Sequence, residues 1–378
     1  MPGTYALLEE DFPMTTRVKL LMTPAEDLDT HAIRKRLEKH LDTLRSRRLA
    51  HELIGDDERS GEFCVEDLSS FAAELSGGTE LTYRDKRRIE ARAKAVVDAR
   101  KRSMGLGHLN EEERRAIMRL MPDVAAITIA TEHRADEIAA EIHEEMPWMA
   151  RATEHAWHAL SRAARRGEPV VIPPVILQGP SGIGKSHWAC RLAEAIGLPA
   201  ADIDATKGGA VSALIGTERG WGSAEPGRPV ETLLMHRVAN PMMIVDEVEK
   251  AQHQTLSQWH SFSFTEALLS LLEPGMAVSW TCPFYRVPLN MSWISWIMTS
   301  NDANGLSAAL LSRSMLIRLT EIPTPDLIAF ASREGRRRGL GATSLDAICD
   351  AILQVNESVS LRNVLRMLDR AEGLHKQK

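Results

Sequence analysis

The stretch Gly179-Pro180-Ser181-Gly182-Ile183-Gly184-Lys185-Ser186 decides how the rest of the chain is interpreted. It matches G-x-x-x-x-G-K-[ST], the phosphate-binding P-loop pattern. Residues 175–177 before it predict a short buried strand, and residues 187–196 after it predict a helix. Glycines allow a tight turn whose N–H groups point at phosphate oxygens, and the start of the helix adds a positive dipole. We therefore expect a nucleotide-binding loop rather than a glycine-rich turn without a ligand.

The loop assigns a role to each of its last two residues. Lys185 is expected to reach the β- and γ-phosphates of ATP, and the Ser186 hydroxyl is expected to bind Mg²⁺. The expected nucleotide-binding residues of this segment are Gly179, Pro180, Ser181, Gly182, Ile183, Gly184, Lys185, Ser186 and His187.

The composition is ordinary for a globular protein: 44% of the 378 residues are hydrophobic, 26% are charged, and the net charge is −6. This charge does not draw the whole chain to nucleic acid or to an anionic membrane, although a local basic face remains compatible with it. The cysteines at 64, 190, 282 and 349 form no C-x-x-C pair, which argues against zinc and suits a reducing compartment. We find neither a signal-peptide pattern nor a membrane-length apolar run, so we expect a cytoplasmic protein.

Strand and helix patterns alternate from residue 170 to about residue 320, which predicts a parallel sheet with helices on both faces. Residues 201–204, 241–247 and 293–301 are further candidate strands. Two of them end in polar groups, Asp246 with Glu247 and Asn301. Because ligands of open α/β sheets bind at the carboxyl ends of strands, these groups are expected at the nucleotide.

Phosphoryl transfer needs a carboxylate that holds the metal and a second group that orients the attacking water. We assign Asp246 to the first task and Glu247 to the second. Asn301 is expected to sense the γ-phosphate or the attacking water. The alternative interpretation is that Asn301 is an ordinary residue of the turn that follows the strand. Arg313 or Arg362 could neutralise charge on the γ-phosphate, and each could instead be an ordinary surface arginine.

The first third of the chain differs from the rest. Residues 31–48 predict an amphipathic helix, and residues 83–101 predict a strongly basic one. The basic face is either a docking surface for nucleic acid or an acidic partner, or an ordinary solvated face. Three helical segments after Pro323 predict a small all-α domain. We therefore expect a helical N-terminal region (1–115), an α/β ATPase domain with leading helices (116–320) and a helical lid (321–378).

His155 and His158 form the only other pair with metal-ligand spacing that we considered. A third ligand is not evident nearby in the sequence, so surface or packing histidines are the favoured interpretation.

Taken in order, these segments resemble the motifs of AAA+ ATPases. Residues 179–186 resemble Walker A, residues 242–247 resemble Walker B, and residues 299–301 resemble sensor 1. Residues 310–313 resemble the arginine finger, and residues 360–363 resemble sensor 2. Within AAA+, the chain resembles the ATPase module of Lon proteases through Asn240-Pro241, Asp246 to Lys250, Leu271 to Pro274, Val287 to Leu289 and Leu316 to Leu319. The resemblance covers roughly residues 145–375.

The resemblance implies a ring, usually of six subunits, in which Arg313 acts on the neighbouring subunit's nucleotide and Arg362 contacts nucleotide from the lid. Trp221 lies between glycines where Lon-type motors carry an aromatic pore loop, so it is expected to grip a protein client. Its alternative is a buried anchor for a long loop. Ser186 and Ser312 replace the usual Thr and the common Asp, changes that keep the chemistry.

The chain ends after the lid, so we expect the Ser-Lys protease domain of Lon to be absent. The leading hypothesis is an ATP-driven ring motor that remodels or unfolds protein clients with ATP and Mg²⁺. One alternative is a nucleic-acid-associated AAA+ switch that uses the basic helix, which would bind more weakly as salt rises. Another is a MoxR-like chaperone dedicated to one partner complex.

Overall fold

The computed structural model describes residues 14–21, 29–54, 81–103, 105–219, 224–253, 263–302, 304–354 and 359–375. Contacts divide the chain into two units, one being Thr23–Arg114 and the other Met1–Met22 with Arg115–Lys378. The predicted pore-loop residue Trp221 lies outside the described residues. Its role therefore stays a prediction, as do the domain boundaries after residues 115 and 320.

A five-stranded, wholly parallel sheet forms the centre of the larger unit, in the order β4-β5-β8-β3-β9. Its strands are β3 (Val175–Gln178), β4 (Ala200–Asp204), β5 (Met242–Asp246), β8 (Ser295–Ser300) and β9 (Met315–Arg318). All six residues of β8 are buried, as expected for a strand covered on both faces. The predicted α/β fold, with the P-loop between β3 and the helix that follows it, is confirmed, and the sheet is consistent with an AAA+ fold.

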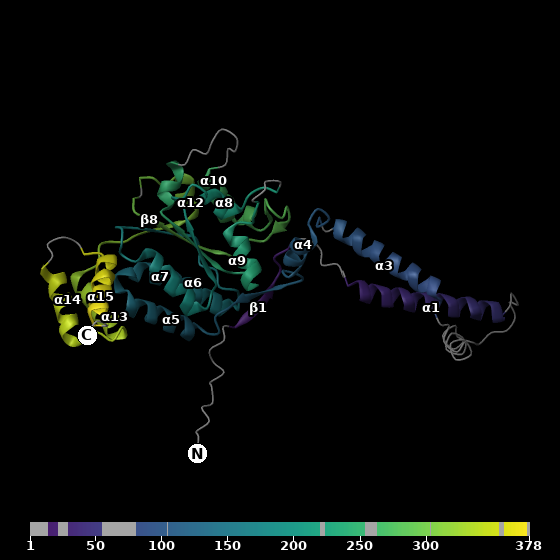
Figure 1. The fold of residues 1–378 in the computed structure, drawn as a ribbon, viewed down its shortest axis with the longest axis horizontal. Coiled ribbons are helices and arrows are strands. Elements are labelled where there is room, and N and C mark those ends of the chain that lie inside the picture. Colours follow the sequence, from purple (N-terminus) through teal and green to yellow (C-terminus); the bar gives the residue numbers. More distant parts are fainter. Residues whose placement is uncertain are drawn as a thin grey trace, which may run out of the picture. The chain divides into compact units, whose positions relative to one another are not determined.

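Helices cover the sheet on both sides. Figure 1 shows α5 (Glu132–Glu145), α6 (Ala150–Arg166) and α7 (Lys185–Ile196) together on one side, and α8 (Ala210–Ile215), α10 (Phe264–Leu272) and α12 (Ala308–Arg313) on the other. Side chains of α5, α6 and α7 share one core with β3, in which Trp188 is fully buried. Further helical elements of this unit are η1 (Pro147–Met149), α9 (Arg228–His236), η2 (Val248–His253) and α11 (Pro274–Ala277).

The last three helices form a bundle with its own core. They are α13 (Thr324–Arg337), α14 (Ala342–Gln354) and α15 (Leu361–His375). Leu327, Phe330, Ile348 and Leu368 are buried among them. The predicted all-α region of three helices after Pro323 is therefore present.

Two small sheets lie outside the sequence expectation. β1 (Thr15–Val18) pairs antiparallel with β2 (Val124–Ile127), and β6 (Trp280–Thr281) with β7 (Pro288–Leu289). These strands are short, so they carry too few alternating apolar residues to be recognised in the sequence. The first pair joins the start of the chain to a segment more than 100 residues later.

Asn240 fixes β2 to the segment that enters β5. It is fully buried. Its Oδ1 accepts from the Ile127 N–H at 2.8 Å, and its Nδ2 donates to the carbonyls of Ile127 and Val170, each at 2.9 Å. One side chain thus satisfies three buried backbone groups, which otherwise cost free energy when they leave water.

The smaller unit is an antiparallel pair of helices, α1 (Thr30–Ile54) and α3 (Tyr83–Ser103), followed by the start of α4 (Glu111–Met118). Their seam is small: Ile33 of α1 packs with Ala93 and Val97 of α3. At the other end Arg45 Nη2 bonds Asp85 Oδ2 at 2.6 Å. The basic residues Arg84, Arg88 and Arg92 are exposed, because the apolar seam takes up the opposite face of α3.

None of the described helices is both long and apolar enough to span a bilayer. Cys190, Cys282 and Cys349 are free thiols, and Cys64 falls outside the described residues. Burial raises the pKa of the Cys190 thiol to about 11, so it stays protonated at neutral pH and is a poor nucleophile.

Candidate functional site

The P-loop wraps tightly and touches the lid. Gly182 and Gly184 have φ of +80° and +91°, in the left-handed region that favours glycine. A Cβ at Gly182 would lie 2.8 Å from Ser360 Cβ, and one at Gly184 would lie 2.8 Å from Leu361 Cδ1. The Leu361 N–H also donates to the Gly182 carbonyl at 2.9 Å. Glycine is therefore required at both positions for two reasons: the turn needs a left-handed backbone, and the lid leaves no room for a Cβ.

Lys185, the first residue of α7, is buried beneath the loop with 7% of its surface exposed. Its Nζ donates to the carbonyls of Gly179 and Pro180, at 2.7 and 2.9 Å, and to Asn301 Oδ1 at 3.0 Å. Burial lowers the pKa of Lys185, and nearby carboxylates oppose that shift, the largest opposing effect coming from Glu249. The ammonium is thus held by the loop and by the end of β8.

Asp246, at the end of β5, gathers two hydroxyls. Ser186 Oγ donates to its Oδ1 at 2.5 Å, and Thr299 Oγ1 donates to the same oxygen at 2.9 Å. This joins three segments that are far apart in the sequence: the P-loop helix, β5 and β8. A hydroxyl beside a carboxylate is a suitable oxygen pair for Mg²⁺, which prefers few protein oxygens and keeps several waters.

Glu247 follows in a strained backbone conformation, with φ of +55°. Asn301 Nδ2 donates to its Oε1 at 3.0 Å, and Lys250 Nζ donates to its Oε2 at 2.5 Å. The Glu247 N–H donates to Thr299 Oγ1 at 3.2 Å. A strained residue whose carboxylate is oriented by two donors is a candidate for chemistry rather than an ordinary turn residue.

Asn301 connects the two halves of the site. Its side chain accepts from Lys185 and donates to Glu247, while its own N–H donates to Glu249 Oε1 at 3.1 Å. The structure therefore brings together four of the residues that sequence reasoning selected: Lys185, Asp246, Glu247 and Asn301.

A cleft of about 1340 Å³ lies over these groups and reaches the lid. Arg362, from the first turn of α15, lines it together with His187. Arg313 is not among the described residues that line the cleft. It stands at the end of α12, where its Nε donates to Glu273 Oε2 at 2.7 Å. The two arginines that the sequence left as alternatives therefore occupy different places.

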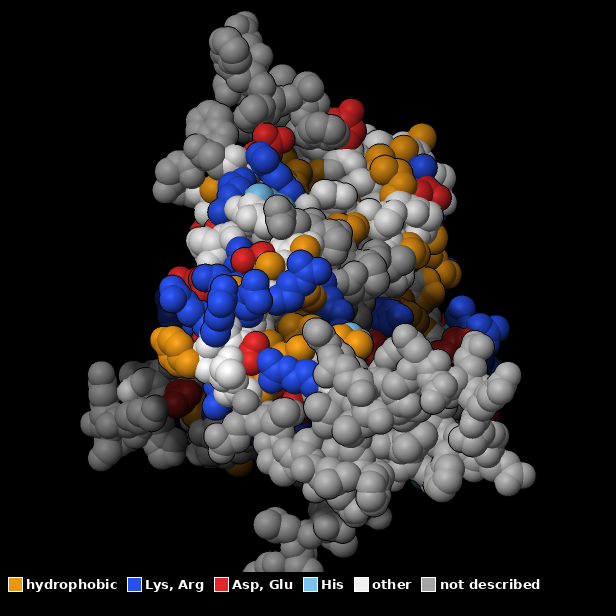
Figure 2. Space-filling view, turned by 90° about the vertical axis from the view of Figure 1, so that its right-hand side faces the viewer, with side chains coloured by type: hydrophobic (Ala, Val, Ile, Leu, Met, Phe, Trp, Pro, Cys, Tyr) orange, Lys and Arg blue, Asp and Glu red, His pale blue; other side chains and the backbone are white. Residues whose placement is uncertain are grey.

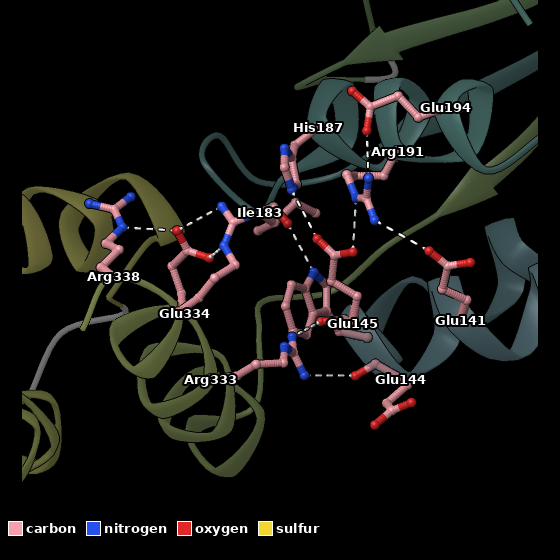
Figure 3. A network of polar contacts seen from close by, with 12 residues as sticks. Glu141, Glu144, Glu145, Ile183, His187, Arg191, Glu194, Arg333, Glu334 and Arg338 are labelled. Carbon is pink, nitrogen blue, oxygen red and sulfur yellow. Dashed lines mark hydrogen bonds and ion pairs between the residues drawn. The ribbon is translucent and has the colours of Figure 1, made fainter. Parts of the chain in front are cut away.

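Two residues that the sequence did not single out bind the lid to the rim of the cleft (Figure 3). Arg333 of α13 donates to the carbonyls of Glu144 and Glu145 at the end of α5, at 2.9 and 2.5 Å. Trp148 Nε1 donates to the Ile183 carbonyl of the P-loop at 2.9 Å. Its ring meets the Phe330 ring edge-on at 6.2 Å. Neither residue belongs to a local motif, so only contacts between distant segments reveal them.

A charged cluster lies at the same rim. Arg191 donates to Glu145 Oε2 at 3.0 Å and also pairs with Glu141 and Glu194 (Figure 3). Burial tends to raise the pKa of Glu145, but Arg191 and then His187 outweigh burial, so that pKa is lowered. His187 thus contacts Glu145 at 3.3 Å beside the loop, as well as lining the cleft.

The remaining histidine pair is used differently. His155 Nε2 contacts the Pro173 carbonyl at 3.3 Å, and His158 Nε2 faces Glu154 at 4.0 Å. Burial, as the first cause, lowers the pKa of His155. The two rings therefore contact separate partners.

The residues fit a nucleoside triphosphate with Mg²⁺. The loop closes at left-handed glycines, a twelve-residue helix starts at its end, and a buried ammonium lies beneath it. The Ser186 hydroxyl and the Asp246 carboxylate face each other within hydrogen-bond distance. Donors and acceptors of these kinds are the ones that phosphates and a hard cation require.

Comparisons with known proteins agree with the class of fold. The chain is 27% identical over 205 residues to a mitochondrial Lon protease homolog of Phaeodactylum tricornutum, covering 51% of this chain and 23% of that protein. It is 30% identical over 189 residues to a peroxisomal Lon protease homolog 2 of Caenorhabditis elegans, covering 50% and 23%. It is 27% identical over 201 residues to a Lon protease of Aster yellows witches'-broom phytoplasma, covering 51% and 24%.

The predicted resemblance to Lon proteases is therefore confirmed over about half of the chain. The chain spans about a quarter of the length of these relatives. No protein-family model matches the chain.

Proposed function

We propose that this protein is an ATP-hydrolysing AAA+ ring motor, similar to the motor part of Lon proteases, that remodels or unfolds protein clients. The observation that carries the proposal is the connected set of polar contacts at the strand ends. Lys185, Asn301 and Glu247 form one chain of hydrogen bonds, and Ser186, Asp246 and Thr299 form a second. Each group required for phosphoryl transfer is thus held by another member of the set.

The two chains of contacts divide the chemistry between them. Ser186 and Asp246 would hold Mg²⁺, which supplies charge neutralisation on the phosphates. Lys185 would bind the phosphate oxygens from beneath the loop. Glu247 would accept the proton of the attacking water, and Asn301 would hold that carboxylate in place through its Nδ2. Lys250 Nζ donates to the second oxygen of Glu247, so both oxygens of that carboxylate are oriented by a donor.

The location of the two arginines supports different roles. Arg362 lines the cleft of its own chain, as expected for a lid residue that contacts the nucleotide. Arg313 stands away from the described lining of that cleft and is oriented by Glu273. This arrangement supports an arginine finger that acts on the nucleotide of a neighbouring subunit, and therefore an oligomeric ring. Measuring the mass of the assembly in the presence of ATP tests the ring. A hexamer and a cytoplasmic location remain predictions.

Both ends of the segment that contains Trp221 are joined. The Thr217 N–H donates to the Glu225 carbonyl at 3.0 Å, and Gly216 pairs with Pro226. A Cβ at Gly227 would lie 2.4 Å from the Leu214 carbonyl oxygen, so only glycine fits this neck. The client contact of Trp221 is proposed from the resemblance to Lon-type motors, and these contacts show that the described residues on either side of it lie together.

The first experiment measures ATP turnover by the full chain and by Glu247→Gln, each alone and with an unstructured polypeptide. The parental protein is expected to hydrolyse ATP faster with polypeptide, and Glu247→Gln is expected to bind ATP while turnover falls about 100-fold or more. Equal turnover in both would refute the assignment of the base.

Two further variants separate the parts of the proposal. Arg313→Ala is expected to bind ATP but lose turnover, and unchanged turnover would rule out a finger acting between subunits. Trp221→Ala is expected to keep basal turnover and lose the stimulation by polypeptide. Stimulation that persists in Trp221→Ala would assign the client contact elsewhere.

The basic helix α3 favours a second candidate, a nucleic-acid-associated AAA+ switch. It carries nine Lys or Arg and three Asp or Glu in 21 residues, on a chain whose net charge is −6. Arg84, Arg88 and Arg92 are exposed at four-residue spacing, which places them along one face. Figure 2 shows Lys and Arg side chains gathered on the face of the molecule that it presents.

Binding of duplex DNA to the full chain, measured over a range of salt, tests this second candidate. The switch hypothesis expects affinity to fall steeply with salt, and it expects the triple variant Arg84→Ser, Arg88→Ser, Arg92→Ser to flatten that dependence. Affinity that is weak and equal in both proteins would reject it and leave the motor as the proposed function.

A further inference from the structure

Glu249 lies directly behind the candidate site and has no role in the function proposed so far. It belongs to η2, three residues after Asp246, and 7% of its surface is exposed. Its Oε1 accepts the Asn301 N–H at 3.1 Å. Its Oε2 is buried and has no hydrogen-bond partner among the described residues.

A buried carboxylate with a single neutral donor needs an explanation. Removing a charge from water costs several kcal/mol by the usual order of magnitude, and one hydrogen bond to a neutral donor, together with the attraction to the Lys185 ammonium, only partly offsets that cost. An apolar side chain of similar volume would fill the same space without the cost. Glu249 is therefore a poor choice for stability alone.

The surroundings of Glu249 point to what the carboxylate does. A Cβ at Gly305 would lie 3.0 Å from both Glu249 Cβ and its carbonyl oxygen, so the segment after β8 packs closely on this residue. Within that segment the only described main-chain group that bonds the carboxylate is the Asn301 N–H. The contact holds Asn301 at its backbone N–H, while its side chain binds Lys185 and Glu247.

Asn301 has to be held for its two side-chain contacts to be made together. Its Oδ1 accepts from Lys185 at 3.0 Å while its Nδ2 donates to Glu247 at 3.0 Å. A shift of the backbone by a fraction of an ångström would lengthen one bond or the other. Small displacements of this kind are costly when groups must be aligned for reaction.

We propose that Glu249 is a positioning residue for ATP hydrolysis, which fixes the Asn301 backbone so that its side chain bridges Lys185 and Glu247. The inference rests on the proposed ATPase function. It adds a residue that acts through Asn301 and does not touch the nucleotide.

The decisive variant is Glu249→Met, which removes the acceptor oxygen and keeps the volume. Because a buried, poorly paired charge is replaced by an apolar side chain, the melting temperature is expected to stay the same or rise. ATP turnover is expected to fall by about tenfold while ATP affinity changes little, as for a group that acts in the transition state. A residue with a purely structural role would show the opposite pattern, a lower melting temperature at unchanged turnover.

A double-mutant cycle with Asn301→Ala tests whether Glu249 acts through Asn301. If it does, Glu249→Met causes no further loss of turnover once Asn301 has been replaced. Glu249→Gln retains an acceptor oxygen for the Asn301 N–H and is expected to recover most of the turnover. Ser161→Ala is the matched control, because the Ser161 hydroxyl is also buried without a described partner but belongs to α6.

The outcomes separate this inference from the function beneath it. A parental chain that hydrolyses no ATP would refute the proposed function and the positioning role together. Parental turnover that Glu249→Met retains in full would refute the positioning role alone. The positioning role would also be refuted if the losses of turnover caused by Glu249→Met and by Asn301→Ala multiplied in the double variant.

Discussion

Two regions of the molecule carry many polar side chains but use them in opposite ways. One is the strand-end cluster, the polar contacts at the ends of β5 and β8 that include Asp246 and Asn301, and the other is the pair of helices α1 and α3. At the ends of β5 and β8, Asp246 and Asn301 bond to other side chains of the cluster, and Thr299 is 3% exposed. On α3, Arg84 and Arg88 are exposed, and the apolar seam with α1 is small. Polar residues that hold each other constrain chemistry, whereas exposed charges leave the choice of partner open.

The largest effect should come from the ammonium at the centre of the cluster. Lys185→Met removes the charge and three hydrogen bonds, so ATP turnover is expected to fall about 100-fold or more, with weaker ATP binding. The matched variant Lys94→Met removes an exposed lysine of α3 and is expected to leave turnover unchanged. Equal losses in a turnover assay would erase the contrast between the two regions.

The next effect concerns stability behind the site. Asn240→Ala would remove three buried hydrogen bonds, to the Ile127 N–H and to the carbonyls of Ile127 and Val170, at an expected cost of about 2–4 kcal/mol in the free energy of unfolding. Urea unfolding followed by circular dichroism measures this loss. Asn304→Ala, at an exposed asparagine, is the control. Equal midpoints for both variants would mean that the three bonds contribute little.

A smaller and more local effect is expected in the helix pair. Val97→Ala removes two methyl groups from the seam and should lower its local stability by about 1–2 kcal/mol. Amide hydrogen exchange should become faster in α1 and α3 while ATP turnover is unchanged. The exposed Ala95 offers Ala95→Ser as a control. A change in turnover would show that the two regions are energetically coupled.

The smallest effect is a titration in the same pair. The Thr82 hydroxyl first, and then the Arg45 guanidinium, hold the pKa of Asp85 at about 2 instead of 3.8. A carboxyl with a lowered pKa stabilises the folded form above pH 3.8, and that contribution is lost as the pH falls toward about 2. Carboxyl NMR should show this midpoint, and Thr82→Ala should raise it. A parental midpoint near 3.8 would show that the contacts do not persist in solution.

The sequence predicted the features that are encoded locally. The P-loop, the buried strand before Asp246 and the helices of the lid each have a pattern within a dozen residues. The structure then brings Lys185, Asp246, Glu247 and Asn301 together at one edge of the sheet, as expected from strands that end there.

The residues that the sequence did not predict depend on contacts between distant segments. Asn240 was noted only as part of a resemblance, although it bonds residues more than 60 positions away. Trp148 and Arg333 touch the loop and α5 through the packing of the lid. In the sequence, Glu249 cannot be told apart from the acidic residues next to it, and its burial in the structure is what distinguishes it. Periodicity and spacing carry no information on such pairs.

The pairing of β1 with β2 has a consequence for how this chain can vary. Val18 lies opposite Val124, and the Asn290 N–H donates to the Leu20 carbonyl at 2.7 Å, so the chain is anchored before residue 23 and again after residue 114. Residues 23–114 are therefore an insertion in the sequence of the larger unit, which runs from β1 to β2, two strands that pair with each other. In evolutionary terms such a cassette can be lengthened, exchanged or lost without rerouting the chain through the sheet.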